Sequence, residues 1–204
     1  MGQLTFCFLK LLPSTTQMGF SYAADDGPAM CFNAAKSWQL GWYSNRTVTV
    51  NPLSAGWSGK LVGLVDYQST TGNPVLLKIN TSTDTDYYMM FNRKAGLNAG
   101  TMEGADQIVI ETQSGEGTAY GQSTLVAKLS AGGTYSISNF NSSGRTVTIK
   151  VNAISLTTTP AYASVSVSAA SSSGATCVGY GGTCGSGKTC CSGYTCNSSK
   201  YKCL

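Results

Sequence analysis

Cysteines are the residues in this chain whose type and spacing point most directly to a chemistry. The chain has 8 cysteines in 204 residues, and most of them lie between Cys177 and Cys203. A segment that short cannot bury enough apolar surface to fold alone, so it needs disulfides or a metal. Zinc sites usually use histidine or paired C-x2-C knuckles, and the chain has neither. We therefore expect disulfides and an oxidising, extracellular environment.

Histidine is absent from the whole sequence, and this limits the catalytic chemistry open to the chain. Nucleophilic triads that use histidine are excluded. Carboxylate pairs or a lysine base remain, but no spacing singles one out. Asp84 and Asp86 lie in a Thr/Ser loop and are too few for a calcium site. We predict no catalytic residue and no metal ligand.

Charge is sparse, which argues against several partner classes. Charged residues make up 11% of the chain and the net charge is +4, mostly from Lys188, Lys200 and Lys202 in a C-terminal segment without acids. This balance predicts neither a nucleic-acid surface nor a polybasic membrane patch. No apolar run reaches the roughly 18 residues of a membrane span.

Secretion is supported by four N-x-[ST] glycosylation sequons, at Asn45, Asn80, Asn141 and Asn197. The first residues are a poor signal peptide, because Lys10 breaks a short apolar run that has neither a basic start nor a small-residue cleavage site. If the protein is secreted, its true start is missing from this sequence.

Composition and pattern divide the chain into five segments. A helix is expected from about Cys31 to Leu40, with Gly41 as its stop. A further strand near Ser164–Ser168 is an option inside the Ser/Thr/Ala-rich linker. The segments are an anomalous N-terminus (1–17), an aromatic segment (18–45), a β region (46–156), a linker (157–176) and a cystine-rich module (177–204).

The β region predicts an antiparallel β-sandwich of about eight short strands. Apolar or alternating runs recur between turn clusters; Val147, Ile149 and Val151, for example, alternate with polar residues. The expected strands are Thr47–Val50, Leu61–Tyr67, Val75–Ile79, Tyr87–Phe91, Gln107–Glu111, Leu125–Leu129, Thr134–Phe140 and Arg145–Val151.

Several segments carry a family resemblance: Met18–Tyr22, Asp25–Pro28 and Cys31–Tyr43, with Tyr88–Arg93 and Glu103–Asp106 further along. Over roughly residues 18–156 they resemble gametolysin-type zinc metallopeptidases, a metzincin family. The resemblance implies that Met18 is the methionine of the metzincin Met-turn. It also implies that Cys31–Tyr43 is the closing helix of the catalytic domain, so that residues 18–45 are a remnant of that domain.

The catalytic part of the family is not carried over. Its signature, H-E-x-x-H-x-x-G-x-x-H, supplies three zinc-binding histidines and a general-base Glu. This chain has no histidine, residues 1–17 contain no acid, and Phe20 stands where related metzincins have Tyr. Zinc is therefore expected only in a full-length relative. Either the gene model was cut short, or a stable protein has lost its catalytic half.

The tail has the spacing C-x6-C-x5-C-C-x4-C-x6-C, from which sequence alone does not choose a pairing. This spacing, with adjacent Cys190 and Cys191, resembles inhibitor-cystine-knot peptides. That resemblance implies the bridges Cys177–Cys191, Cys184–Cys196 and Cys190–Cys203. The two other cysteines, Cys7 and Cys31, could pair with each other, but only parity supports this.

The end of the tail, Tyr201–Leu204, also resembles small fungal-type cellulose-binding modules. Those modules lay flat aromatic rings against sugar faces, which implies Tyr180, Tyr194 and Tyr201 as candidate glycan-binding residues. The plain alternative is that these tyrosines are only the largest residues of a tiny fold.

Two functions from different classes are therefore expected. The first is the C-terminal portion of a secreted gametolysin-like zinc metalloendopeptidase, catalytically incomplete as given, with wall or matrix glycoproteins as the substrates that the resemblance implies. The second is a non-catalytic extracellular protein that binds a polysaccharide or glycoprotein through its cystine-rich tail. Sequence upstream of Met18 would discriminate between them.

Overall fold

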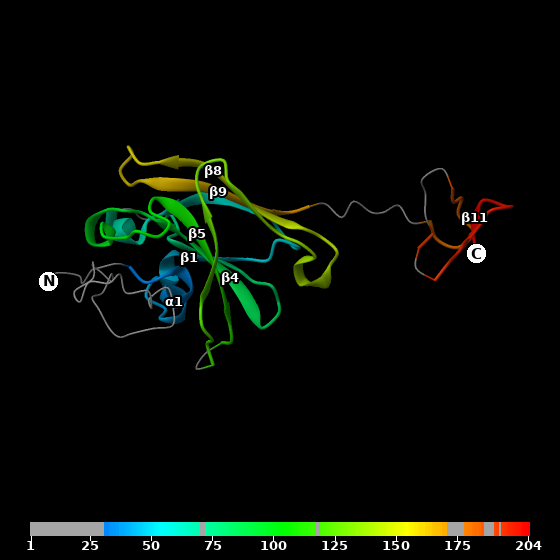
Figure 1. Cartoon of the computed structure of the whole chain (residues 1–204), viewed down its shortest axis with the longest axis horizontal. Helices are drawn as coiled ribbons and strands as arrows, with labels where there is room; N and C mark the ends of the chain where they lie inside the picture. The colour runs from blue at the N-terminus through cyan, green and yellow to red at the C-terminus, as the bar shows by residue number, and fades with distance from the viewer. Residues whose placement is uncertain (1–30, 70–71, 117–118, 171–177, 186–189, 192) are drawn as a thin grey trace. The chain divides into compact units, whose positions relative to one another are not determined.

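The computed structural model describes residues 31–69, 72–116, 119–170, 178–185, 190–191 and 193–204. The chain divides into two units, Met1–Ala169 and Ala170–Leu204, and each is described by itself (Figure 1). The structure is mainly β, with mixed and antiparallel sheets followed by a disulfide-rich C-terminal region. No helix of the described residues is long and apolar enough to cross a membrane.

The first sheet of unit 1 has five strands in the order β1-β3-β4-β5-β6. These are β1 (Thr47–Val50), β3 (Leu76–Ile79), β4 (Thr85–Asn92), β5 (Gln107–Ser114) and β6 (Thr124–Leu129). All neighbours are antiparallel except β1 and β3, which run parallel. The expectation of a purely antiparallel sandwich is therefore wrong at this edge. The chain passes through the second sheet between β1 and β3, and such a crossover permits parallel pairing.

The second sheet is antiparallel, with four strands in the order β2-β9-β8-β7. Its strands are β2 (Trp57–Val62), β7 (Thr134–Ile137), β8 (Val147–Ser155) and β9 (Tyr162–Ala169). The prediction that residues 157–176 form a linker is wrong for residues 162–169, because these form β9 between β2 and β8. The strand expected as an option near Ser164–Ser168 is therefore present and longer, with Ala163, Val165 and Val167 alternating into the core.

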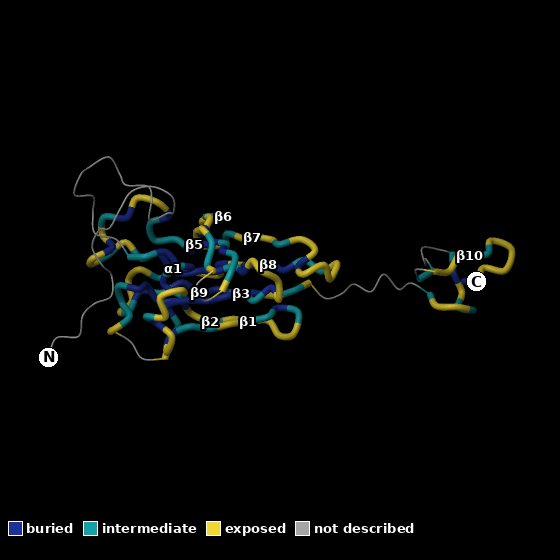
Figure 2. The backbone as a smooth tube through the Cα atoms, turned by 90° about the horizontal axis from the view of Figure 1, so that it is seen from below, coloured by how far each residue is buried: buried dark blue, intermediate teal, exposed yellow. Residues whose placement is uncertain are grey.

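The two sheets pack face to face through one apolar cluster, so the architecture is a β-sandwich. Buried positions, dark blue in Figure 2, include the whole of β3, whereas the edge strands β1 and β7 are intermediate or exposed. The cluster takes residues from both sheets, including Leu77, Ile79, Met89, Phe91, Ile108 and Ile110 from the first and Leu61, Val147, Ile149, Val151, Val165 and Val167 from the second.

Helix α1 (Ala34–Gln39) covers the other face of the first sheet. A second apolar cluster joins Ala34 and Ala35 to Leu76, Tyr88 and Met90. Residues 31–45 therefore pack as part of the sandwich unit. The helix is shorter than expected because the Asn33 side chain caps it, accepting a hydrogen bond from the Lys36 N–H. Gly41, with φ +66°, follows its end.

Short 3-10 turns connect several strands. One of them replaces half of an expected strand, Leu61–Tyr67, because β2 begins and ends earlier. At Gly59 a Cβ would lie 2.5 Å from the Trp57 ring, so the glycine lets that ring lie along β2. The turns are η1 (Ser44–Arg46), η2 (Leu64–Ser69), η3 (Gly96–Asn98) and η4 (Phe140–Ser142).

Unit 2 has very little regular structure. Strands β10 (Cys196–Asn197) and β11 (Lys202–Cys203) form an antiparallel pair. An isolated bridge between Thr183 and Lys202 connects β11 to a preceding loop, and another joins Val178 to Cys190. With so little backbone pairing, the disulfides must supply much of the order of this unit.

Candidate functional site

Two disulfides of unit 2 have the pairing that the cystine-knot resemblance implies. Cys184 is bonded to Cys196 with Cα atoms 5.9 Å apart, and Cys190 to Cys203 with Cα atoms 5.5 Å apart. Both separations are ordinary for a disulfide. Cys191 is disulfide-bonded as well, whereas its expected partner Cys177 lies outside the described residues.

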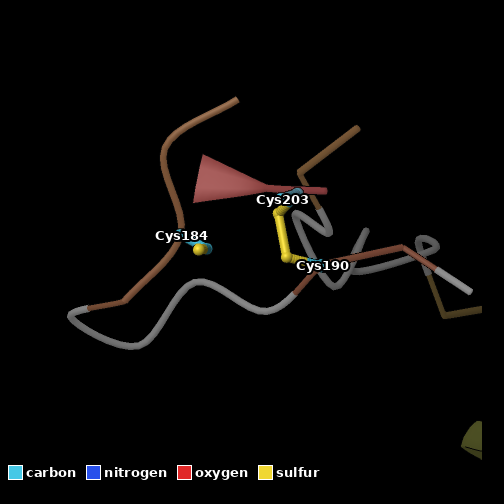
Figure 3. A group of neighbouring side chains, drawn as sticks. All are labelled: Cys184, Cys190 and Cys203. Carbon is cyan, nitrogen blue, oxygen red and sulfur yellow. A yellow bond between two sulfur atoms is a disulfide. The ribbon is translucent and has the colours of Figure 1, made fainter. Parts of the chain in front are cut away.

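The two bridges lie against each other. The Sγ atoms of Cys184, Cys190 and Cys203 all fall within 4.8 Å of one another. Figure 3 labels these three side chains and draws the Cys190–Cys203 bond. Cys184 and Cys203 are 2% and 0% exposed. This sulfur cluster has the dimensions of a metal site, but sulfurs held in disulfides cannot act as thiolate ligands. We therefore assign it as the packed centre of the module.

Three tyrosines of the same unit are exposed. Tyr180, Tyr194 and Tyr201 are 72%, 44% and 62% exposed. The structure brings the first two together, with ring centroids 5.9 Å apart and ring planes tilted by 48°. Tyr201 has no ring contact to either of them among the described residues; its ring lies over Gly185, where a Cβ would come within 3.2 Å of it.

Backbone pairing explains how these tyrosines are placed. The Cys184 N–H donates to the Tyr201 carbonyl at 2.9 Å, and the Gly181 N–H donates to the Cys203 carbonyl at 2.7 Å. The segment after Tyr180 therefore runs antiparallel to β11. Tyr180 itself lies in a turn closed by the Gly182 N–H, which donates to the Gly179 carbonyl at 3.0 Å, whereas Tyr201 lies directly before β11.

The remaining residues of the expected sites are scattered. Met18 and Cys7 lie outside the described residues, and Cys31 is disulfide-bonded. Of the sequon asparagines, two are exposed and two are half-buried. The exposed pair is Asn45 and Asn141, and the half-buried pair is Asn80 and Asn197.

A buried polar layer beneath α1 was not anticipated from the sequence. Glu111 on β5 is 0% exposed, and its Oε2 accepts a hydrogen bond from the Ala35 N–H. The Lys36 ammonium donates to the Gly121 carbonyl at 3.0 Å, and the Asn33 amide donates to the Ser123 hydroxyl at 2.9 Å. Three polar contacts thus attach this one short helix to β5 and the segment that leads into β6.

Electrostatics in this layer are dominated by burial. Burial raises the pKa of the Glu111 carboxyl to about 7, opposed by the backbone N–H groups of Ala35 and Ala34 and by the Lys36 charge. Its Oε1, and both polar atoms of the Gln113 side chain, have no hydrogen-bond partner among the described residues. The one sequence signal for this layer is Glu111, an acid that directly follows the apolar run Ile108–Ile110.

A second buried charge lies on the same face of the sheet. The Lys78 ammonium is 2.7 Å from the Asp86 carboxylate, and both side chains are almost fully buried. The ammonium also lies 5.4 Å from the centre of the Trp38 ring and 5.7 Å from that of Tyr88. Since its charge is paired with Asp86 and covered by aromatic rings, this lysine helps to hold α1 onto the sheet.

The described residues of the sandwich also line a shallow pocket of about 200 Å³. It is lined by Ser37, Trp38, Gly41, Ser44 and Thr47, and this lining includes no titratable side chain. Neither acid–base catalysis nor metal binding is therefore supported by these groups.

Comparison with protein-family models, with curated proteins and with solved structures gave no match. The functional interpretation therefore rests on the residues and the geometry of this chain.

Proposed function

We propose that the cystine-rich module binds carbohydrate through Tyr180, Tyr194 and Tyr201. The observation that carries the proposal is the exposure of all three rings in a unit of so few residues. Aromatic side chains are normally drawn inside a fold, and an exposed group of them commonly marks a binding surface. Sugar rings present C–H groups on their faces, and these pack well against flat aromatic rings.

The geometry favours an extended ligand over a single sugar. Tyr180 and Tyr194 form one aromatic pair, and Tyr201 has no ring contact to either of them among the described residues, so it offers a second contact. A ligand that touches both places must be longer than one sugar ring, as a polysaccharide chain is. The disulfides fix the backbone that carries the rings, so little ordering entropy opposes binding.

We also propose that the sandwich belongs to the non-catalytic C-terminal portion of a secreted gametolysin-like metalloendopeptidase. Two segments that carry the resemblance, Cys31–Tyr43 and Tyr88–Arg93, pack together within one unit. The Trp38 and Tyr88 rings, one from each segment, have centroids 6.0 Å apart. Their contact supports a shared origin for the two segments, and the glycan-binding tail would then hold the enzyme on its wall or matrix substrate.

Retention of the purified chain on insoluble cellulose and chitin tests the binding function. We expect the wild-type chain to be retained and Tyr180→Ala, Tyr194→Ala and Tyr201→Ala each to weaken retention by about 1–2 kcal/mol, the scale of a lost aromatic contact. The matched Tyr→Phe variants keep the ring and should be retained. The proposal would be contradicted if the wild-type chain passed through both polysaccharides, or if the alanine variants were retained as well as wild type.

A further inference from the structure

The sulfur cluster of unit 2 combines one accessible end with a buried centre. Cys196 is an exposed residue, Cys190 is half-buried, and Cys184 and Cys203 are buried. Cys196 is bonded to Cys184, whose Sγ lies within 4.8 Å of both sulfurs of the neighbouring bridge (Figure 3). An external reagent therefore meets the first bridge at Cys196, while the other end of that bridge touches the second bridge.

We propose that Cys196 is a site of covalent modification by low-molecular-weight thiols, and that modification moves the second bridge from Cys190–Cys203 to Cys184–Cys203. The ligand class is a small thiol such as glutathione or cysteine. The inference does not depend on carbohydrate binding.

The chemistry is two successive thiol–disulfide exchanges. In the first, the external thiolate attacks the Cys196 Sγ, forms a mixed disulfide there and expels Cys184 as a thiolate. In the second, the Cys184 thiolate attacks the Cys203 Sγ, forms the Cys184–Cys203 bond and expels Cys190. The Cys190 thiolate takes a proton from water. One thiol is consumed and one is produced, so no oxidant or further reductant is required.

Burial decides the direction of each step. Attack at Cys196 is favoured over Cys184 because an external thiol must reach the sulfur, and Cys184 is 2% exposed. The expelled Cys184 thiolate is then a charge in a buried position, which is costly unless it reacts. Attack on Cys203 expels the half-buried Cys190, where water can stabilise the new thiolate, whereas attack on Cys190 would leave a thiolate on Cys203 at 0% exposure.

Graded glutathione treatment of the full chain tests the proposal, with free thiols trapped by N-ethylmaleimide and the linkages mapped by mass spectrometry without reduction. We expect glutathione on Cys196, a Cys184–Cys203 link and N-ethylmaleimide on Cys190, in equal amounts. N-Ethylmaleimide on Cys184 beside an intact Cys190–Cys203 bond would overturn the relay. Glutathione on Cys184, or no adduct before the module is wholly reduced, would overturn the modification site.

Two variants provide a matched control that needs no added thiol. Cys196→Ser leaves Cys184 as a thiol inside the cluster, and the purified variant should already contain the Cys184–Cys203 link. Cys184→Ser leaves the exposed Cys196 as the thiol and should keep Cys190–Cys203 unchanged. If both variants keep Cys190–Cys203, the sulfurs do not exchange. The wild-type titration remains decisive should either variant fail to fold.

Discussion

The Glu111 carboxylate accepts a hydrogen bond from the Ala35 N–H at 3.1 Å, across 76 residues of sequence. A single buried acid on β5 thereby holds the first turn of α1, a helix of 6 residues that is too short to be stable alone. The other carboxylate oxygen has no partner among the described residues. Ionisation of Glu111 therefore places a poorly solvated charge between the helix and the sheet.

Stability should fall as this acid ionises. Burial raises the pKa of Glu111 from 4.5 to about 7, so the folded state holds the proton more tightly than the unfolded chain. The contribution of Glu111 is full below pH 4.5 and is lost as the pH rises to about 7, on the order of 3 kcal/mol. Glu111→Gln keeps an acceptor for Ala35 and cannot ionise. Urea unfolding between pH 4 and 8 should show a flatter profile for this variant, and parallel profiles would contradict the role of Glu111.

Removing the helix cap should loosen α1 from the sheet. Asn33→Ala loses the side-chain bond from the Lys36 N–H and the bond to Ser123, so we expect a cost of about 1–2 kcal/mol in urea unfolding. Asn33→Asp keeps the cap acceptor but not the amide donor, and should cost less. Equal losses for the two variants would mean that the cap contributes nothing.

Replacing an unpaired buried amide should stabilise the sandwich. Both polar atoms of Gln113 lack a partner among the described residues, and the side chain is 1% exposed. Gln113→Met keeps a similar shape without polar atoms and should raise the free energy of unfolding by about 1 kcal/mol. Thr112→Val, one residue earlier on the other face of β5, is the control for changes in strand propensity. A destabilised Gln113→Met would show that the amide is satisfied after all.

Replacing one partner of the Lys78–Asp86 pair should destabilise the fold more than replacing both. Lys78→Met leaves the Asp86 carboxylate buried without Lys78, and Asp86→Asn leaves the Lys78 ammonium buried without Asp86. We expect each variant to lower the free energy of unfolding by about 3–5 kcal/mol. The double variant removes both charges and should recover part of that loss. A double-mutant cycle by chemical unfolding measures the coupling, and additive losses would mean that the 2.7 Å contact carries no net interaction.

The chain should not hydrolyse protein. It has no histidine to hold zinc, so added zinc should leave a casein-like substrate intact at the level of a boiled sample. Chelator-sensitive cleavage by the purified chain would contradict the proposal that this is a non-catalytic portion of a peptidase.

Local patterns in the sequence were enough to locate most of the sandwich. Strand β1 coincides with its expected bounds, and β4 and β5 extend the expected ones by a few residues, because β-branched and aromatic runs between turn residues are a local signal. The parallel β1–β3 pairing and the place of β9 depend on which strands meet, which no local pattern records.

The candidate sites differ in the same way. The exposed tyrosines could be anticipated because they lie within a few dozen residues of one another, and the two observed cysteine pairs because the spacing resembles inhibitor-cystine-knot peptides. The polar layer beneath α1 could not be anticipated, because the contact of Glu111 with Ala35 forms only when a helix from a distant part of the chain packs over β5.

The position of β9 sets an order of assembly during synthesis. Trp57 on β2 pairs with Val167 on β9, about 110 residues later in the chain, and β8 also borders β9. The second sheet therefore stays in two pieces until the ribosome has made nearly the whole sandwich. The cystine-rich unit, Ala170–Leu204, is synthesised after β9. The last strand of the sandwich therefore emerges before the cystine-rich unit, so the second sheet can close before the disulfides of that unit form.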